Sequence, residues 1–182
     1  MKETASQTAG PYVHIGCVPS VAGLEMYRGQ DLGAKMLSPD VTGERITLHG
    51  VIHDGSGAPV TDAMIEIWQA DAEGRFDNPA FLGWGRQATD AQTGAFRFDT
   101  ILPGPVTQDD GTRHAPHILM WIVARGINLG LMTRVYFDDG PDPVLDQVPA
   151  ARRQTLIAQR DGPKLRFDVH LQGAQETVFF DV

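Results

Sequence analysis

Residues 45–51 read Arg-Ile-Thr-Leu-His-Gly-Val, and here the chain begins to alternate apolar with polar side chains. Alternation of period two is typical of a β-strand with one buried face. The turn sequence Asp54-Gly55-Ser56-Gly57 follows, and its glycines can adopt positive φ. The pattern therefore predicts a half-buried strand that ends in a tight turn.

Similar patterns recur downstream and predict about seven strands in all. The others are expected at 63–69, 96–98, 118–124, 131–137, 165–171 and 177–182. The continuous apolar run 118–124 predicts a strand buried on both faces. One helix is expected at 150–160, after Pro149. Because strands do not alternate with helices, the sequence predicts an all-β fold: an antiparallel two-sheet β-sandwich with one short helix in its C-terminal half.

Residues 1–44 differ from the remainder of the chain. They lack alternation and are rich in Gly, Pro, Ser and Ala, with one short helix expected at 30–37. Such a segment resembles an arm that lies on a surface, possibly that of another chain. We therefore expect a single domain, 1–182, with an arm at 1–44 and the sandwich at 45–182.

Composition excludes several classes of function. The chain has 182 residues with 15 Lys and Arg against 23 Asp and Glu, for a net charge of −8. This balance argues against binding to nucleic acid or to an anionic membrane. No apolar segment has the length of a signal peptide or of a membrane span. Cys17 is the only cysteine, which excludes an internal disulfide and suits a reducing compartment, so we expect a cytoplasmic protein.

Sequence motifs do not reveal a self-sufficient catalytic site. There is no Gly-x-Ser-x-Gly motif, no phosphate-binding glycine loop and no dinucleotide fingerprint. Cys17 has His14 nearby, but no acid that would orient the histidine is evident, so an inert thiol is the favoured interpretation. His49 and His53 would lie about 13 Å apart on a strand, too far to share a metal.

A second histidine pair, His114 and His117, lies in a loop before the apolar run. These side chains could converge on a metal. The alternative is an ordinary loop histidine bonded to backbone, and the lack of a carboxylate or thiolate partner favours it.

Two charged residues stand in apolar surroundings. Glu66 lies between Ile65 and Ile67, where alternation directs it to the opposite, solvated or edge face. Arg134 shares a face with Met132 and Tyr136. Its guanidinium must reach water, pair with an internal acid, or clamp an anionic ligand or partner, and the pattern leaves these alternatives open.

Several motifs taken together resemble the intradiol ring-cleavage dioxygenases, from about Gln7 to the C-terminus. They are Gln7-Thr8-Ala9-Gly10-Pro11-Tyr12-Val13-His14-Ile15-Gly16, Ile65-Glu66-Ile67-Trp68-Gln69-Ala70-Asp71-Ala72-Glu73-Gly74, Pro103-Gly104-Pro105, Ala115-Pro116-His117-Ile118, Arg134-Val135-Tyr136-Phe137-Asp138-Asp139 and Glu176-Thr177-Val178-Phe179-Phe180. The combination is specific, although each motif alone is not.

The resemblance implies that this chain has lost its own iron site. Iron-binding chains of the family hold Fe³⁺ with two tyrosines and two histidines. The tyrosines correspond here to Phe76 and Val106, and the histidines to His117 and Leu119. Fe³⁺ prefers anionic oxygen donors, which Phe76, Val106 and Leu119 do not provide. We therefore expect no cofactor on this chain, no catalytic residue of its own, and Fe³⁺ in a partner.

The resemblance to this family also implies which partner chain holds the iron and which substrate is cleaved. In its two-chain members the iron lies in a related β chain, which cleaves 3,4-dihydroxybenzoate with O₂ to 3-carboxy-cis,cis-muconate. The other chain borders the pocket, and the corresponding positions here are Thr8, Gly10, Tyr12 and Arg134. The sequence thus predicts an iron-free dioxygenase subunit that lines the pocket of an iron-bearing β chain and is inactive alone. A non-enzymatic β-sandwich binding module is the alternative.

Overall fold

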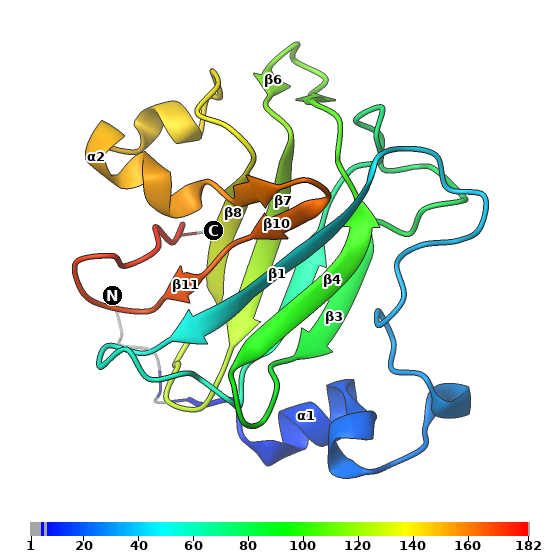
Figure 1. Cartoon of the computed structure of the whole chain (residues 1–182), viewed down its shortest axis with the longest axis vertical. Helices are drawn as coiled ribbons and strands as arrows, with labels where there is room; N and C mark the ends of the chain where they lie inside the picture. The colour runs from blue at the N-terminus through cyan, green and yellow to red at the C-terminus, as the bar shows by residue number, and fades with distance from the viewer. Residues whose placement is uncertain (1–4, 6, 182) are drawn as a thin grey trace.

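The computed structural model describes residues 5 and 7–181, and it forms a sandwich of two sheets (Figure 1). In one sheet, β1 (Arg45–His53) pairs with β4 (Ala95–Ile101) on one side and with β10 (Lys164–Arg166) and β11 (Val169–His170) on the other. Strand β9 (Gln159–Asp161) pairs with β10. The second sheet has the order β3 (Trp84–Ala88), β2 (Met64–Trp68), β7 (His117–Val123), β8 (Leu131–Tyr136). A small hairpin joins β5 (Val106–Thr107) to β6 (Arg113–His114).

The core lies between the two sheets and confirms the predicted alternation. In β1, the side chains of Ile46, Leu48 and Ile52 are buried. They face β2 and β7, whose Ile65, Ile67 and Ile122 belong to the same apolar cluster. The all-β sandwich is therefore confirmed, with one addition: β1 pairs in parallel with β10 and β11, so its sheet is mixed.

Some predicted elements differ in the structure. The helix expected at 150–160 is only α2 (Ala150–Arg153), followed by the 3₁₀ turn η4 (Gln154–Leu156), because the chain must then return to the sheet as β9. Residues 177–182 form no strand within the described part; Phe180 makes an isolated bridge with Met132. Strand β3 was not predicted, since Trp-Gly-Arg-Gln-Ala shows no apolar alternation.

Strand β7 was predicted to be buried on both faces, and this is wrong. Ile118, Met120 and Ile122 point into the core, whereas the residues between them are only half-buried. The apolar run arises because the outer face of this sheet carries several large apolar side chains. A groove of about 370 Å³ there is lined by Ile67, Trp68, Trp84, Leu119, Trp121 and Met132, and also by Glu66.

The N-terminal segment contains short helical turns, but not where they were expected. Residues 30–37 form no helix; instead the backbone carbonyl of Gly33 accepts a hydrogen bond from the N–H of Arg86, 3.0 Å away. The helix is α1 (Pro11–Cys17), which begins at a proline suited to the first turn and buries none of its residues. The 3₁₀ turns η1 (Pro19–Ala22) and η2 (Tyr27–Gly29) follow.

The segment joins the core before residue 44. Met36, 4% exposed, and Val41 belong to the main apolar cluster. Met36 packs against Gly85, where a Cβ atom would lie 2.6 Å from the methionine sulfur. Most of residues 7–35 lie on the surface, with Val18 and Pro19 as buried exceptions, and Figure 1 shows α1 below the sandwich. Helices in the described part of the chain are all too short to cross a bilayer.

Candidate functional site

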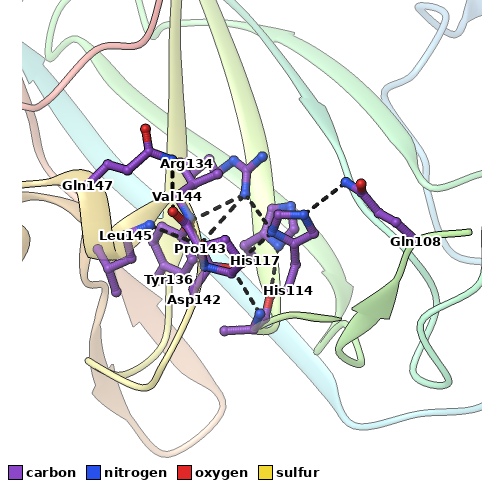
Figure 2. A network of polar contacts seen from close by, with 11 residues as sticks. Gln108, His114, His117, Arg134, Tyr136, Asp142, Pro143, Val144, Leu145 and Gln147 are labelled. Atoms are coloured by element: carbon purple, nitrogen blue, oxygen red, sulfur yellow. Dashed lines mark hydrogen bonds and ion pairs between the residues drawn. The ribbon is translucent and has the colours of Figure 1, made fainter. Parts of the chain in front are cut away.

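Arg134 lies at the centre of a polar network at one end of the second sheet (Figure 2). It occupies β8 opposite Leu119 of β7, and its side chain is 18% exposed. Alternation along β8 directs it to the outer face, next to the apolar groove. The same network contains His114 from β6, Tyr136 from β8 and Asp142 from the following loop.

Asp142 anchors the network. Its side chain is fully buried, and it accepts five hydrogen bonds. Oδ1 receives the hydroxyl of Tyr136 at 2.8 Å and the backbone N–H groups of Val144 and Leu145 at 2.9 Å. Oδ2 receives the N–H of Ala115 at 3.0 Å and Nδ1 of His114 at 3.2 Å. One carboxylate thus ties three segments together, and it accepts the N–H of Leu145, the first residue of the turn η3 (Leu145–Gln147).

The surroundings shift the pKa of two groups in this network. Burial alone raises the pKa of Asp142, but hydrogen bonds from Leu145 N–H, Tyr136 and other donors outweigh it and hold the pKa below its ordinary value. Burial is the main reason that the pKa of Tyr136 lies well above its ordinary value. Near neutral pH, Asp142 is therefore an anion, and Tyr136 is a neutral phenol that donates its proton to it.

Arg134 uses one nitrogen for all of its internal contacts. Nη1 lies 3.4 Å from the hydroxyl of Tyr136, 3.5 Å from Nδ1 of His114 and 4.0 Å from Oδ1 of Asp142. Nε and Nη2 make no hydrogen bond or ion pair with any described residue. The two alternatives for Arg134 are thus compatible, because the inner nitrogen pairs internally while the edge formed by Nε and Nη2 is available for a bidentate contact.

The two loop histidines have different partners. Nδ1 of His117 lies 2.7 Å from the carbonyl of Ala115, as the interpretation of a backbone-bonded histidine predicted. Burial and the charge of Arg134 lower the pKa of His117, so it is neutral near pH 7. His114 contacts Asp142 instead, and its Nε2 lies 2.9 Å from the side-chain nitrogen of Gln108. With Gln108 donating to Nε2 and the carboxylate of Asp142 able only to accept, Nδ1 is the ring nitrogen that donates to Asp142.

The four positions that the family resemblance assigns to iron ligands do not fit an iron ion. Phe76 is half exposed and stacks on Trp68 with ring centroids 6.0 Å apart. Val106 and Leu119 have no donor atom, and His117 alone offers a ring nitrogen. Within residues 5 and 7–181, no three His, Cys, Asp or Glu side chains are grouped to hold a metal. No chemical step on a metal can therefore be assigned to these residues.

The arm residues proposed to border a pocket do not meet Arg134 within this chain. The hydroxyl of Thr8 accepts the N–H of Gly126 at 2.9 Å, in the loop beyond the far end of β7. Gly10 lines a cavity of about 430 Å³ beneath α1. Tyr12 is 87% exposed. Four residue steps along β7, roughly 13 Å of strand, separate Leu119 from Val123 before that loop begins.

The other candidate residues make contacts within the fold. Glu66 forms an ion pair with Arg86, and both side chains are partly buried. Its strand β2 pairs with β3 and with β7, so Glu66 lies on an inner strand and not at an edge. His53 stacks on His170 with centroids 4.9 Å apart, a contact between strands far apart in sequence. Cys17 contributes its carbonyl to Arg86 at 3.4 Å.

Sequence analysis missed Asp142 and the roles of Tyr136 and His114. One local signal was present: an aspartate followed by Pro143 and an apolar residue at Leu145 is typical of a residue that caps a turn. The contacts of His114 with Arg134 and Asp142 join residues 20 and 28 positions apart, for which the sequence carries no periodic signal.

Comparisons with known proteins agree on one family. A family model described as "Dioxygenase" matches residues 26–173. The alpha chain of protocatechuate 3,4-dioxygenase from Pseudomonas putida is 44% identical over 100% of this chain and 97% of its own length. The alpha chain from Burkholderia cepacia is 42% identical, over 100% and 98%. The beta chain from Burkholderia cepacia is 33% identical, over 84% and 78%.

Solved structures show the same fold at lower identity. The 3-chlorocatechol 1,2-dioxygenase from Rhodococcus opacus 1CP matches with a TM-score of 0.61 and 22% identity, over 77% of this chain and 65% of that one. The dioxygenase domain of a carbohydrate-binding fusion protein from Streptomyces sp. SirexAA-E matches with a TM-score of 0.59 and 24% identity, over 95% and 100%.

Proposed function

The chain belongs to the intradiol ring-cleavage dioxygenase family, as a full-length relative of protocatechuate 3,4-dioxygenase alpha chains, and from this premise we propose that it works as the iron-free subunit beside an iron-bearing beta chain. The complex cleaves 3,4-dihydroxybenzoate with O₂ between the two hydroxylated carbons, which gives 3-carboxy-cis,cis-muconate. The alternative of a non-enzymatic binding module lacks support, since the full-length relatives named above are enzyme chains. The reducing compartment suggested by the single cysteine fits a cytoplasmic enzyme.

One observation carries this chain's part in the reaction: Arg134 lies opposite Leu119, which lines the groove, and its Nη1 contacts Tyr136 and His114 while Nε and Nη2 bond no described residue. The substrate of the complex is a planar aromatic carboxylate. A guanidinium edge binds a carboxylate with two parallel hydrogen bonds, and an apolar rim strengthens them by excluding water. We therefore assign Arg134 to the substrate carboxylate at the border of the partner's pocket.

Thr8, Gly10 and Tyr12 remain proposed border residues of that pocket. Their distance from Arg134 along β7 means that a shared pocket needs a different arm position in the complex, or an arm from another copy. Seven large apolar side chains of residues 12–32 are exposed, which favours an arm that packs on another chain. They are Tyr12, Ile15, Val21, Leu24, Met26, Tyr27 and Leu32.

The main test is to coexpress this chain with a candidate beta chain and to measure iron content and ring cleavage. We expect the two chains to copurify, with iron and with activity toward 3,4-dihydroxybenzoate. A chain that stays alone in the presence of the beta chain would contradict the proposal.

The isolated chain is expected to hold no stoichiometric iron and to be inactive. The physical reason is the lack of donor atoms. Phe76, Val106 and Leu119 stand at the proposed ligand positions, so the neutral imidazole of His117 is the one donor that these positions retain. Elemental analysis and the visible phenolate-to-iron absorption check this, with the copurified complex as the positive control. About one tightly bound iron per isolated chain would refute it.

Hydrogen–deuterium exchange is expected to divide the arm into two parts. Amides of 11–32 should exchange fast in the isolated chain and slowly in the complex, because α1 buries no residue of its own. Amides of the buried residues Met36 and Val41 should be protected in both states, as in β1. Equal protection of α1 and β1 in the isolated chain would show that the arm needs no partner.

A further inference from the structure

The hydroxyl of Tyr136 lies between Asp142 and Arg134 and contacts both (Figure 2). A carboxylate can only accept, so the phenolic proton goes to Oδ1 of Asp142 at 2.8 Å. The oxygen lone pairs are then available to Nη1 of Arg134 at 3.4 Å. Because the Tyr136 side chain is fully buried, neither contact competes with bulk water.

Tyr136 is the nearest acceptor for Arg134 in this network. Oδ1 of Asp142 is farther from Nη1, at 4.0 Å. Nδ1 of His114 lies 3.5 Å away, but it carries a proton that goes to Asp142 and so cannot also accept from the guanidinium. The phenol therefore bridges a gap that the carboxylate does not span.

The anchor beneath the phenol is rigid. Asp142 is tied to three backbone N–H groups, from Ala115, Val144 and Leu145. An arginine side chain has several rotatable bonds, and fixing them on binding costs affinity unless they are already fixed. A hydroxyl held by this carboxylate restricts the guanidinium through Nη1 and leaves Nε and Nη2 without a partner among the described residues.

We propose that Tyr136 is a positioning residue, whose hydroxyl holds Nη1 of Arg134 on the Asp142 anchor so that the Nε and Nη2 edge faces the substrate carboxylate. The proposal rests on the proposed role of Arg134. It adds how the orientation of the guanidinium is fixed before the substrate binds.

The test is the Tyr136→Phe variant in the two-chain complex, assayed with 3,4-dihydroxybenzoate and with catechol, which lacks the carboxylate. We expect kcat/KM for the benzoate to fall about 3- to 10-fold, mostly through KM, with catechol turnover unchanged. The matched control is Thr133→Val on the same strand. This substitution removes a buried hydroxyl that donates to the carbonyl of Val178 and does not contact Arg134. It should therefore leave the ratio of kcat/KM for the two substrates unchanged.

A double-mutant cycle separates this proposal from the role of Arg134 itself. In an Arg134→Leu background, Tyr136→Phe should not further change the ratio of kcat/KM for 3,4-dihydroxybenzoate to kcat/KM for catechol, because the guanidinium that Tyr136 positions is gone. If Arg134→Leu lowers the ratio and Tyr136→Phe alone does not, the positioning role is wrong and the clamp stands. If Arg134→Leu leaves the ratio unchanged, the clamp itself is wrong.

A second measurement needs neither catalysis nor the partner. The Nε–H order parameter of Arg134, from NMR relaxation on the full-length chain, should fall in Tyr136→Phe and stay constant in Thr133→Val. An unchanged order parameter would overturn the proposal even if the Tyr136→Phe chain failed to assemble.

Discussion

Arg134→Leu in the two-chain complex is expected to lower kcat/KM for 3,4-dihydroxybenzoate about 10- to 100-fold, with a far smaller effect on catechol. The Nε and Nη2 edge is available for a carboxylate, and a charge-assisted contact of this kind is worth roughly 1.5–3 kcal/mol. If the contact is equally strong in the ground and transition states, the loss should appear mainly in KM. Steady-state kinetics with both substrates measure the difference.

Arg134→Lys and the size of the complex are the controls for this prediction. Lysine should restore only part of the loss, because a single ammonium replaces a two-pronged guanidinium. If Arg134 instead held the interface together, both substrates would lose activity equally and the complex would dissociate in a sizing experiment. That outcome would show a structural arginine and contradict the clamp.

Asp142→Ala is expected to destabilise the chain by about 3–5 kcal/mol at neutral pH. The substitution leaves five buried or partly buried donors without their acceptor, including the N–H of Leu145 at the start of η3. Denaturant unfolding of the isolated chain measures the loss.

The matched control is Asp138→Ala in the same loop. Asp138 is exposed and accepts one backbone hydrogen bond, from Gly140, so it should change the free energy of unfolding by about 0.5 kcal/mol or less. Equal losses in the two variants would mean that the buried network contributes no more than a surface turn.

The stabilisation from Asp142 should depend on pH in a defined direction. Its pKa is lower in the folded chain than the unfolded value of about 3.9, so its contribution is complete above that value and is lost as pH falls through the folded pKa. The difference in unfolding free energy between wild type and Asp142→Ala should therefore narrow between about pH 5 and pH 2. A constant difference across that range would contradict this assignment.

The local pattern of the sequence was enough to predict the sandwich and much of its core. Ile46, Leu48, Phe96 and Phe98 alternate with polar residues and are buried as expected. Side-chain direction along a strand depends only on position, so this information is local. The motif resemblance was likewise sufficient to predict the family. That Phe76, Val106 and Leu119 stand where iron-binding chains carry ligands stays a prediction.

Tertiary structure alone decided the remainder, because it depends on contacts between distant segments. Strand β3 exists because Trp84–Ala88 pairs with β2, although its own residues show no alternation. The run 118–124 is open on one face, since no described segment covers the groove that its outer residues line.

The setting of Arg134 depends on the fold in the same way. Its position between Leu119, Tyr136 and Asp142 required β7, β8 and the 142–145 loop to meet, and the sequence pattern left its role open between an ion pair and a clamp. The sequence determined which side chains carry charge and which face of a strand they occupy. The fold determined which nitrogen of the guanidinium pairs internally and which edge is available to a ligand, because that follows from three-dimensional packing.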